Sequence, residues 1–268
     1  MQRVTHLKHP AFRAACRLTQ PGPREAERRF LMEGASAIAK ALHAPLRPLE
    51  VYIKEEFEPE LAAACAQMSV PVYSVSKGLF HRLLVSSYET STTAVAVMPC
   101  WEISLDEVCQ QREGMVLIAE RIQDPRNMGM LIRTADAARV RALVLASPLA
   151  DPYSRPCVRS TTGSIAFLPI VACSTSREVL DSFRASGWRQ IGSSAQSQRL
   201  LWEESLTAPC CLWVGNEETG LLPETRAAMD ALVRIPMGGG AHSLNVAVAT
   251  GIMLFEAVRQ DVASRMGR

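Results

Sequence analysis

Three short polar clusters in the second half of the chain contain side chains that are able to bind a ligand or take part in a reaction. The first, DPRNMGMLIRTADA, contains Asn127 and Arg133, and the second, WVGNEETGL, contains Glu217. The third, IPMGGGAHSLN, places three consecutive glycines before Ser243 and Asn245. Glycines let the backbone approach a ligand closely, arginine holds anions, and carboxylate, amide and hydroxyl groups orient polar substrates. Taken alone, Arg133 would by default be a surface arginine.

The other cluster residues also have structural explanations. Asn127 is expected to be the N-cap of the helix that follows it. Residues 215–219 would form a solvated turn before a helix that starts at Pro223. Ser243 would cap the last helix, with Asn245 in its first turn. The argument for a binding site is that every cluster begins where a predicted strand ends, because the carboxyl ends of parallel strands meet at one edge of a sheet.

Several common kinds of site are disfavoured. The glycines do not form G-x-G-x-x-G after the first strand of this half, and G-x-x-x-x-G-K-[ST] does not occur, which argues against dinucleotide and P-loop nucleotide sites. No Ser/His/Asp arrangement can be recognised, because His242 is the only histidine after residue 105. We interpret His242 as a loop residue rather than a catalytic base.

The elements that position the clusters follow an α/β pattern. Six short apolar runs, with helical stretches between most of them, predict a mostly parallel sheet with helices on both faces. The predicted strands are 115–119, 142–146, 169–172, 189–192, 210–214 and 232–235.

The first hundred residues predict a separate small α/β domain. The more polar stretch 100–114 interrupts the pattern, so we place one domain at 1–105 and the other at 106–268. A chain of 268 residues is long enough for about two domains. The elements predicted in the first domain are a helix at 35–43, a strand at 49–53, a helix at 59–68, a strand at 72–75, a helix that begins near residue 77, and a strand at 93–98.

The last predicted helix has an unusual composition. After Ser243, the run LNVAVATGIMLF is apolar almost all round until Glu256, whereas a surface helix should have one polar face. Burial inside this chain is one explanation, and packing against the same helix in a two-fold homodimer is the other.

Composition indicates a globular protein. The chain is 48% hydrophobic and 21% charged with a formal net charge of +2, so neither disorder nor a strongly basic tail is indicated. The opening segment is nevertheless basic, because only Glu25 and Glu27 offset seven cations there. These cations form either a phosphate-binding surface or an exposed, solubilising helix. The seven are Arg3, Lys8, Arg13, Arg17, Arg24, Arg28 and Arg29.

The eight cysteines argue against a metal site, because they form no C-x-x-C pair and have no histidine at zinc spacing. Several lie in apolar runs, which suits a reducing compartment. No apolar stretch approaches the ~20 residues of a membrane span, and the start lacks a signal-peptide hydrophobic region. We expect a cytoplasmic protein with neither a metal nor a membrane partner.

In order and spacing, the three clusters resemble the signature motifs of the SpoU (TrmH-like) RNA ribose 2′-O-methyltransferases, a branch of the SPOUT methyltransferases. The segments that match are DPRNMGMLIRTADA, WVGNEETGL and IPMGGGAHSLNVAVATGIMLFE. RRFLMEGASAIAKAL through TAVAVMP also looks like the family's amino-terminal substrate-binding domain, which is similar to a ribosomal protein that grips RNA. The resemblance covers nearly the whole chain.

The resemblance implies a fold and a cofactor. Members tie the carboxyl-terminal part of a parallel-sheet α/β domain into a deep trefoil knot, and the loops of the knot hold S-adenosylmethionine through mostly backbone groups. The residues implied at the cofactor site are Gly215, Ile235 and Leu244, with Ser193, Met237 and Val214 close by.

The resemblance also implies the reaction, which is methyl transfer from S-adenosylmethionine to a ribose 2′-hydroxyl of structured RNA. It favours ribosomal RNA over transfer RNA as the substrate. Arg133 matches the motif arginine, but a guanidinium holds its proton too firmly to act as a base at neutral pH. We therefore expect Arg133 to stabilise the developing alkoxide and to hold the adjoining phosphate. Glu217 would orient Arg133 or a ribose group. The residues expected to hold the nucleotide and the motif loops are Asn127, Ser243 and Asn245.

Two positions depart from the family pattern. The family usually has glycine where this chain has Arg139, and often has glycine where it has Glu218. Arg139 would alter a helix end or add a phosphate contact, and Glu218 adds negative charge near the cofactor.

RNA affinity is expected to come from the first domain and the basic opening segment, in particular Arg24, Arg28 and Arg29, because a catalytic pocket reads little more than one nucleotide. A catalytically inactive RNA-binding scaffold is one rival function. Another is methylation at a pyrimidine ring carbon by a cysteine nucleophile, prompted by Pro-Cys pairs at 99–100, 156–157 and 209–210. None of these pairs lies in a charged setting that would activate a thiol.

Overall fold

The chain folds into two compact units, as described by a computed structural model for residues 1–84, 91–240 and 243–266. The first unit comprises Met1–Trp101 and Pro152–Phe167, and the second comprises Glu102–Asp151 and Leu168–Arg268. Residues 152–167 therefore group with the first unit, although they follow the sequence boundary at 105. One reason is an ion pair between Arg155 and Glu33.

The first unit contains a five-stranded mixed sheet and small helices. Its elements are β1 (Gln2–Val4), α1 (Pro10–Arg17), α2 (Pro21–Glu27), β2 (Arg29–Glu33), α3 (Ala35–Ala41), β3 (Glu50–Lys54), α4 (Pro59–Gln67), β4 (Val72–Val75), α5 (Lys77–Phe80), the 3-10 turn η1 (His81–Leu83), β5 (Ala94–Pro99), α8 (Arg155–Thr161) and the 3-10 turn η2 (Ser164–Ala166). The strand order is β1-β4-β3-β5-β2, with β5 antiparallel to both of its neighbours. Phe12 and Leu18, within and just after α1, pack against Tyr52 and Val97 of the sheet.

The predicted elements of the first unit are confirmed. The opening segment, for which an exposed helix was one of two interpretations, contains β1, α1 and α2. β1 pairs with β4, and β2 pairs with β5, so each of these two strands depends on a partner distant in sequence. Short strands of this kind carry little periodic signal of their own.

The second unit contains a six-stranded sheet in which every neighbouring pair is parallel, with order β11-β9-β10-β6-β7-β8. Its elements are α6 (Leu105–Gln110), β6 (Met115–Glu120), α7 (Pro125–Ala137), β7 (Ala142–Ala146), β8 (Ile170–Cys173), α9 (Ser176–Ala185), β9 (Arg189–Ser193), the 3-10 turn η3 (Leu201–Glu203), β10 (Cys210–Val214), α10 (Pro223–Ala227), β11 (Ala231–Val233) and α11 (Val246–Arg265). All six predicted strands are present, and β7 and β10 have the predicted bounds. The fold is thus an α/β fold with a parallel sheet.

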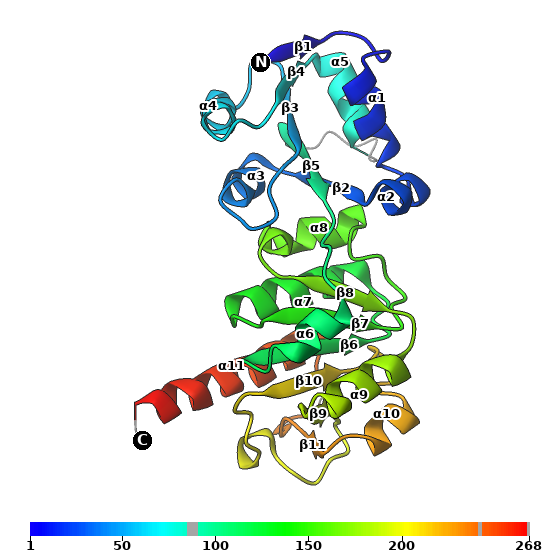
Figure 1. Cartoon of the computed structure of the whole chain (residues 1–268), viewed down its shortest axis with the longest axis vertical. Helices are drawn as coiled ribbons and strands as arrows, with labels where there is room; N and C mark the ends of the chain where they lie inside the picture. Colours follow the sequence, from blue (N-terminus) through cyan, green and yellow to red (C-terminus); the bar gives the residue numbers. More distant parts are fainter. Residues whose placement is uncertain (85–90, 241–242, 267–268) are drawn as a thin grey trace. The chain divides into compact units, whose positions relative to one another are not determined.

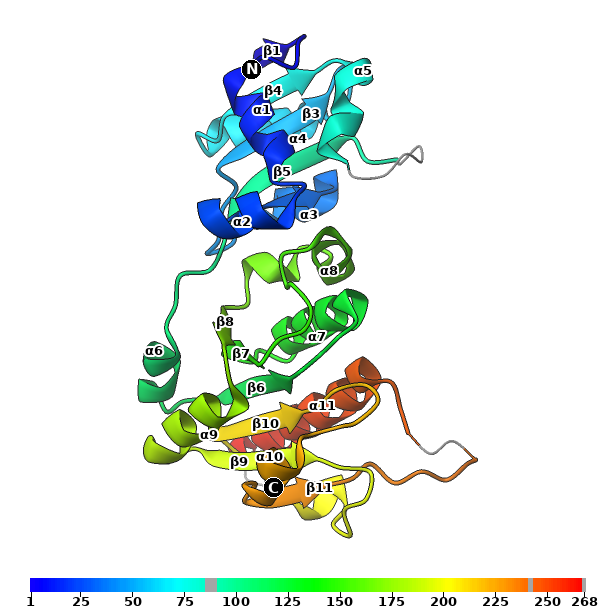
Figure 2. The same cartoon turned by 90° about the vertical axis from the view of Figure 1, so that its right-hand side faces the viewer.

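Helices cover both faces of this sheet. Figures 1 and 2 show α6, α9 and α10 on one face and α7 and α11 on the other. The core of the first face joins Val108 and Phe183 to strand residues such as Ile118 and Trp213. β10 is buried along its whole length, which explains why its sequence is apolar without alternation.

The strand order brings the carboxyl ends of several strands together. After β6 the chain moves outward through β7 and β8, and it then returns to place β10 and β9 on the other side of β6. The loops after β6, β10, β9 and β11 therefore leave the same edge of the sheet, on one side of the point where the order reverses. Ligands of open α/β sheets bind at such a point.

The long helix α11 is buried on one side within this chain. Met253 and Leu254 are buried, whereas Val248 and Phe255 are 47% and 51% exposed. Burial inside the chain therefore does not account for the exposed apolar side chains of the helix, such as Val248 and Phe255. Within the described residues, no helix combines the length and apolarity needed to cross a membrane, and no group of three or more His, Cys, Asp or Glu side chains is arranged to hold a metal ion.

Candidate active site

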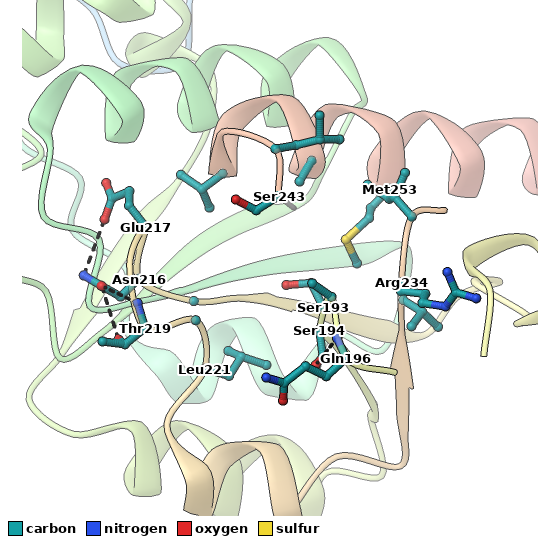
Figure 3. A pocket seen from close by; sticks show the side chains of 18 of the residues that line it. Ser193, Ser194, Gln196, Asn216, Glu217, Thr219, Leu221, Arg234, Ser243 and Met253 are labelled. Atoms are coloured by element: carbon teal, nitrogen blue, oxygen red, sulfur yellow. Dashed lines mark hydrogen bonds between the residues drawn. The ribbon is translucent and has the colours of Figure 1, made fainter. Parts of the chain in front are cut away.

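A pocket of about 300 Å³ lies at the carboxyl edge of the parallel sheet in the second unit (Figure 3). Its walls come from the loops that follow β9, β10 and β11 and from the beginning of α11. A pocket at the ends of parallel strands matches the usual ligand site of such sheets. The lining residues include Ser193, Ser194, Gln196, Gly215, Asn216, Glu217, Thr219, Leu221, Arg234, Ile235, Met237, Ser243, Leu244 and Met253.

The loop after β10 folds tightly on itself. Asn216 and Gly220 exchange two backbone hydrogen bonds, of 3.1 and 2.9 Å, and the Asn216 side chain accepts the Glu218 and Thr219 N–H groups at 3.0 and 3.1 Å. A Cβ atom on Gly215 would lie 2.1 Å from the carbonyl carbon of Gly220. Glycine is therefore required at 215 by the close approach of backbone.

Glu217 holds the loop after β10 against the loop after β6. Its carboxylate accepts the Gln123 and Asp124 N–H groups, each at 3.1 Å, and the Asn127 side-chain amide at 3.0 Å. Partial burial by itself raises the pKa of Glu217, but hydrogen bonds from Asn127 and from backbone N–H groups outweigh it and lower the pKa below its usual value. The carboxylate is therefore held in its ionised form.

Asn127 links three segments through its side-chain amide. While its Nδ2 donates to Glu217, its Oδ1 accepts Asn245 Nδ2 at 2.9 Å. Asn245 in turn accepts the Ala247 N–H at 2.9 Å, at the start of α11. The structure thus brings together the three polar clusters that the sequence analysis singled out.

Both predicted helix caps are wrong by a few residues. α7 begins one turn earlier than expected, so Asp124 is its N-cap and Asn127 lies inside the helix. Asn245, rather than Ser243, caps α11. Asp124 binds the open N–H groups at the start of α7, and Asn245 binds those at the start of α11. Asn127 is therefore available for the network, and Ser243 is a pocket residue.

Arg133 is on the exposed side of α7 and does not line the pocket. Within the described parts of the chain, no hydrogen bond or ion pair holds its guanidinium. The expected contact between Glu217 and Arg133 is thus not made, because backbone N–H groups and Asn127 already occupy the Glu217 carboxylate. His242 lies outside the described residues.

Five of the six residues expected at the cofactor site line the pocket, namely Ser193, Gly215, Ile235, Met237 and Leu244. Val214 is instead buried in β10, one residue before the pocket wall.

Sequence reasoning missed part of the pocket. Ser194 and Gln196 follow β9, and they belong to a polar run, SSAQS, that the strand-end argument would have selected as a fourth cluster. Met253 projects from α11 with its sulfur toward the pocket (Figure 3). Nothing in the sequence distinguishes Met253 from the core residues of the same helix.

A buried carboxylate, Glu120, was also missed. It ends β6 with no exposed surface, accepts the Leu222 N–H at 2.7 Å and is hydrogen bonded to the Thr225 hydroxyl at 2.5 Å. It therefore fixes α10 immediately after the pocket loop.

The cysteines of the three Pro-Cys pairs are buried. Burial raises the pKa of Cys210 to about 12, and the nearby Arg189 lowers it only in part. Cys100 and Cys157 are 5% and 0% exposed. A thiolate nucleophile for methylation of a pyrimidine ring carbon requires access, which none of these three buried cysteines has, and a lowered pKa, whereas that of Cys210 is raised.

The arginines expected to bind RNA have different environments in the first unit. Arg28 and Arg29 are exposed, and Arg28 donates to the Trp101 carbonyl oxygen at 2.7 Å. Arg24 is buried in α2 and donates to the Leu18 and Thr19 carbonyl oxygens, each at 3.2 Å. The expectation of a phosphate contact by Arg24 is corrected accordingly, because its guanidinium is used inside the unit.

Comparison with known proteins gives consistent results over nearly the whole chain. The profile of the SpoU rRNA Methylase family matches residues 114–255. The 23S rRNA (guanosine-2′-O-)-methyltransferase RlmB of Pseudomonas putida is 30% identical over 241 residues, which are 87% of this chain and 97% of that protein. The AdoMet-bound rRNA methyltransferase of Sinorhizobium meliloti has a TM-score of 0.83 at 29% identity, covering 96% of this chain and 97% of that one.

A second solved structure, the SpoU methyltransferase AviRb from Streptomyces viridochromogenes in complex with the cofactor AdoMet, also has a TM-score of 0.83, at 28% identity, and covers 95% of this chain and 100% of its own. Together with the three linked motif segments, these matches show that the chain belongs to the SpoU rRNA methylase family.

Proposed function

We propose that this protein transfers a methyl group from S-adenosylmethionine to a ribose 2′-hydroxyl of structured RNA, and that the RNA is ribosomal. The observation that carries the proposal is the hydrogen-bonded joining of the three motif segments by Asn127, Glu217 and Asn245 beside the pocket. The RlmB relative is named for 23S rRNA, which supports ribosomal over transfer RNA.

The pocket is suited to S-adenosylmethionine. Leu221 and Met253 offer apolar surface for an adenine ring, and Ser193 and Ser194 offer hydroxyls beside the open backbone of the three loops. Pockets of this kind combine apolar walls with a few polar groups that fix orientation. When bound, the cofactor would supply an electrophilic methyl group on a sulfonium sulfur, and the positive charge of that sulfur is lost when the methyl group is transferred.

The remaining work falls to Arg133 and to the side chains that join the motif loops. We infer that Arg133 holds the adjoining RNA phosphate, which accepts the proton of the 2′-hydroxyl, and that it stabilises the alkoxide that forms. Its exposed, unrestrained guanidinium, within the part of the chain that the structure describes, supports this role. Asn127, Glu217 and Asn245 hold the loops at fixed positions, since correct placement of the reacting groups lowers the barrier by itself.

Replacing Arg133 by lysine tests its role. Lysine keeps the charge and loses the planar fork, so kcat should fall by roughly 10²-fold while the Kd for S-adenosylmethionine stays unchanged. Single-turnover methylation and calorimetry measure the two quantities. Near-normal turnover of Arg133→Lys would contradict the assignment.

The proposed reaction has a direct test in two steps. Titration calorimetry should detect S-adenosylmethionine binding, and absence of heat at about 1 mM ligand would favour a catalytically inactive scaffold. Mapping of 2′-O-methylated positions in total RNA, from cells with and without the gene, should then reveal one lost position in ribosomal RNA. Loss of a methylated position in transfer RNA would instead identify transfer RNA as the substrate.

We also infer the deep trefoil knot of the family in the second unit. The route of the chain supports it: after the edge strand β11 the chain returns as α11, which packs against α7 and contacts the segment between β9 and β10. We assign methyl transfer to 106–268. RNA binding we assign to 1–105, as a domain like a ribosomal protein, through Arg28 and Arg29.

We further propose a homodimer formed through the second unit. The exposed apolar side chains of α11 support it, because a stripe of this kind on a long helix favours a partner. The stripe consists of Val248, Ile252, Phe255 and Val262.

A ribosomal RNA substrate is consistent with a cytoplasmic protein.

A further inference from the structure

Gln260 connects α11 to the segment between β9 and β10. Its Oε1 accepts the Leu206 N–H at 2.7 Å, and its Nε2 donates to the Glu204 carbonyl oxygen at 3.0 Å. The same Nε2 donates to Glu256 Oε1 at 2.8 Å. The Gln260 amide therefore binds one backbone N–H group and one backbone carbonyl group of the 204–206 stretch, and both of its N–H hydrogens are used.

The same end of this segment is anchored by charge. The Glu204 carboxylate is 3% exposed and forms ion pairs with Arg189, the first residue of β9, and with Arg199. Burial by itself raises the pKa of Glu204, but hydrogen bonds and charge from Arg199 and Arg189 outweigh it, so the pKa is lowered. A buried charge that is paired in this way holds its surroundings in one arrangement, because breaking the pair is costly.

The other end of the segment forms part of the pocket. Ser194 and Gln196 line it. Between the two ends, Arg199 and Leu201 pair with Arg234, through an Arg234 N–H to Arg199 oxygen bond of 3.0 Å and a Leu201 N–H to Arg234 oxygen bond of 2.9 Å. Arg234 also lines the pocket, so the segment carries the wall that follows β11 as well as the wall that follows β9.

The opposite wall is α11 itself. Ala249 and Met253 line the pocket, and Met253 points into it (Figure 3). Met253, Glu256 and Gln260 follow one another at helical spacings of three and four residues, so they lie on one face of α11. This face lines the pocket near the start of the helix and binds the 204–206 backbone two turns further on.

We propose that Gln260 is a positioning residue that sets cofactor affinity from outside the pocket. By holding the 194–206 segment against α11, its amide fixes the separation of two pocket walls. Gln260 is not one of the described residues that line the pocket. The identity of the ligand rests on the proposed function, whereas the mechanical coupling rests on the hydrogen bonds alone.

The main test replaces Gln260 by methionine, which keeps the length and volume of the side chain and removes its three hydrogen bonds. The Kd and KM for S-adenosylmethionine should rise about tenfold, while kcat at saturating cofactor and KM for RNA stay within about twofold. Gln198→Met is the matched control, because Gln198 is an exposed residue of the same segment, and this variant should match the wild type.

Hydrogen exchange of the protein without cofactor provides a readout independent of catalysis. In Gln260→Met, the Leu206 amide should exchange faster, and the loss of protection should extend to the Leu201 and Arg234 amides. Unchanged cofactor affinity in a folded Gln260→Met would overturn the proposal. Weaker affinity without faster exchange at Leu206 would overturn it too.

Gln260→Glu supplies a rescue that a purely structural role would not give. The charged groups around position 260 are Glu256 and Arg259 on α11, and Glu204 with its partners Arg189 and Arg199 on the facing segment. An ionised glutamate has no donor for Glu256 or for the Glu204 carbonyl, whereas a protonated one has a single O–H that restores one of these two hydrogen bonds. Relative to wild type, affinity should therefore be low near pH 8 and recover in part towards about pH 5.5.

Gln260→Met should stay weak at both pH values, and recovery there would contradict the assignment. If Gln260→Met does not fold, Gln260→Glu still decides the question through its pH dependence. A wild type that binds no S-adenosylmethionine would refute the proposed function. A wild type that binds and methylates normally, beside variants of equal affinity, would refute the role of Gln260 only.

Discussion

At the scale of single residues, the arrangement of the site depends on one carboxylate. Glu217 accepts hydrogen bonds from two backbone N–H groups and from Asn127, which also binds Asn245. The sequence predicted that Glu217 orients a cation or a ribose. In the structure its carboxylate organises the loops, and within the described residues no hydrogen bond joins it to Arg133.

Glu217→Gln should separate this role from charge alone. A neutral amide presents one acceptor where the carboxylate presents two, so we expect a loss of about 1 kcal/mol in stability and weaker cofactor binding at pH 7. Thermal unfolding and calorimetry measure the two effects, and Glu113→Gln, at an exposed residue of the same unit that does not line the pocket, is the control.

The lowered pKa of Glu217 fixes the direction of the pH dependence. Because the folded pKa lies below the ordinary value of 4.5, the stability that the ionised group contributes is fully present well above pH 4.5 and is lost as pH falls below it. The difference in unfolding free energy between wild type and Glu217→Gln should therefore shrink in acid. A difference that grows in acid would refute the arrangement.

At the scale of elements, backbone geometry determines which residues are tolerated around the site. The 215–220 loop leaves no room for a side chain at Gly215. Arg139, where the family usually has glycine, follows the C-cap residue of α7 with a φ of 54°, the left-handed conformation that glycine adopts most readily. This departure thus retains the backbone turn and adds an exposed charge.

Gly215→Ala should disrupt the site, whereas Gly238→Ala should not. The new Cβ at 215 would meet backbone atoms of Gly220 and Leu221 at 2.1 and 2.2 Å, which cannot move without opening the loop. At 238 nothing lies within 4 Å. We expect loss of S-adenosylmethionine binding and about 2–4 kcal/mol of destabilisation in the first variant, and near-neutral behaviour in the second. Equal cofactor affinity of both variants would exclude a tight loop at 215.

At the scale of the whole molecule, two predictions concern partners. The first is the dimer: Phe255 is 51% exposed in the middle of the apolar stripe of α11. Phe255→Arg should convert a dimer to a monomer in sedimentation experiments, because a charge in an apolar interface is costly. Arg265→Glu, near the end of the helix, should remain dimeric. A monomeric wild type would disprove the proposed dimer.

The second prediction concerns the separate tasks proposed for the two units, RNA binding for the first and cofactor binding for the second. Charge reversal at Arg28 and Arg29 should weaken RNA binding and reduce the salt dependence of that binding by about one unit of slope for each lost phosphate contact. Cofactor affinity should not change. Lys40→Glu makes the same kind of charge change on α3 of the same unit and serves as the control. Equal loss of RNA and cofactor affinity would contradict the division.

The sequence by itself determined the strands of the parallel sheet, the order of the motif segments and the family. Strands such as β10 are buried on both faces, so they appear as continuous apolar runs that need no knowledge of their neighbours. The loop glycine at 215 and the polar residues after each strand are local signals too.

Only the tertiary structure decided what the polar side chains contact. Asn127 and Glu217 are 90 positions apart, and Asn127 and Asn245 are 118 apart, so no local pattern contains their pairing. Arg24 looks like its basic neighbours in sequence but is enclosed by carbonyl groups. Periodicity reports which face of an element is apolar, whereas the partner of a polar group is set by long-range packing of the chain.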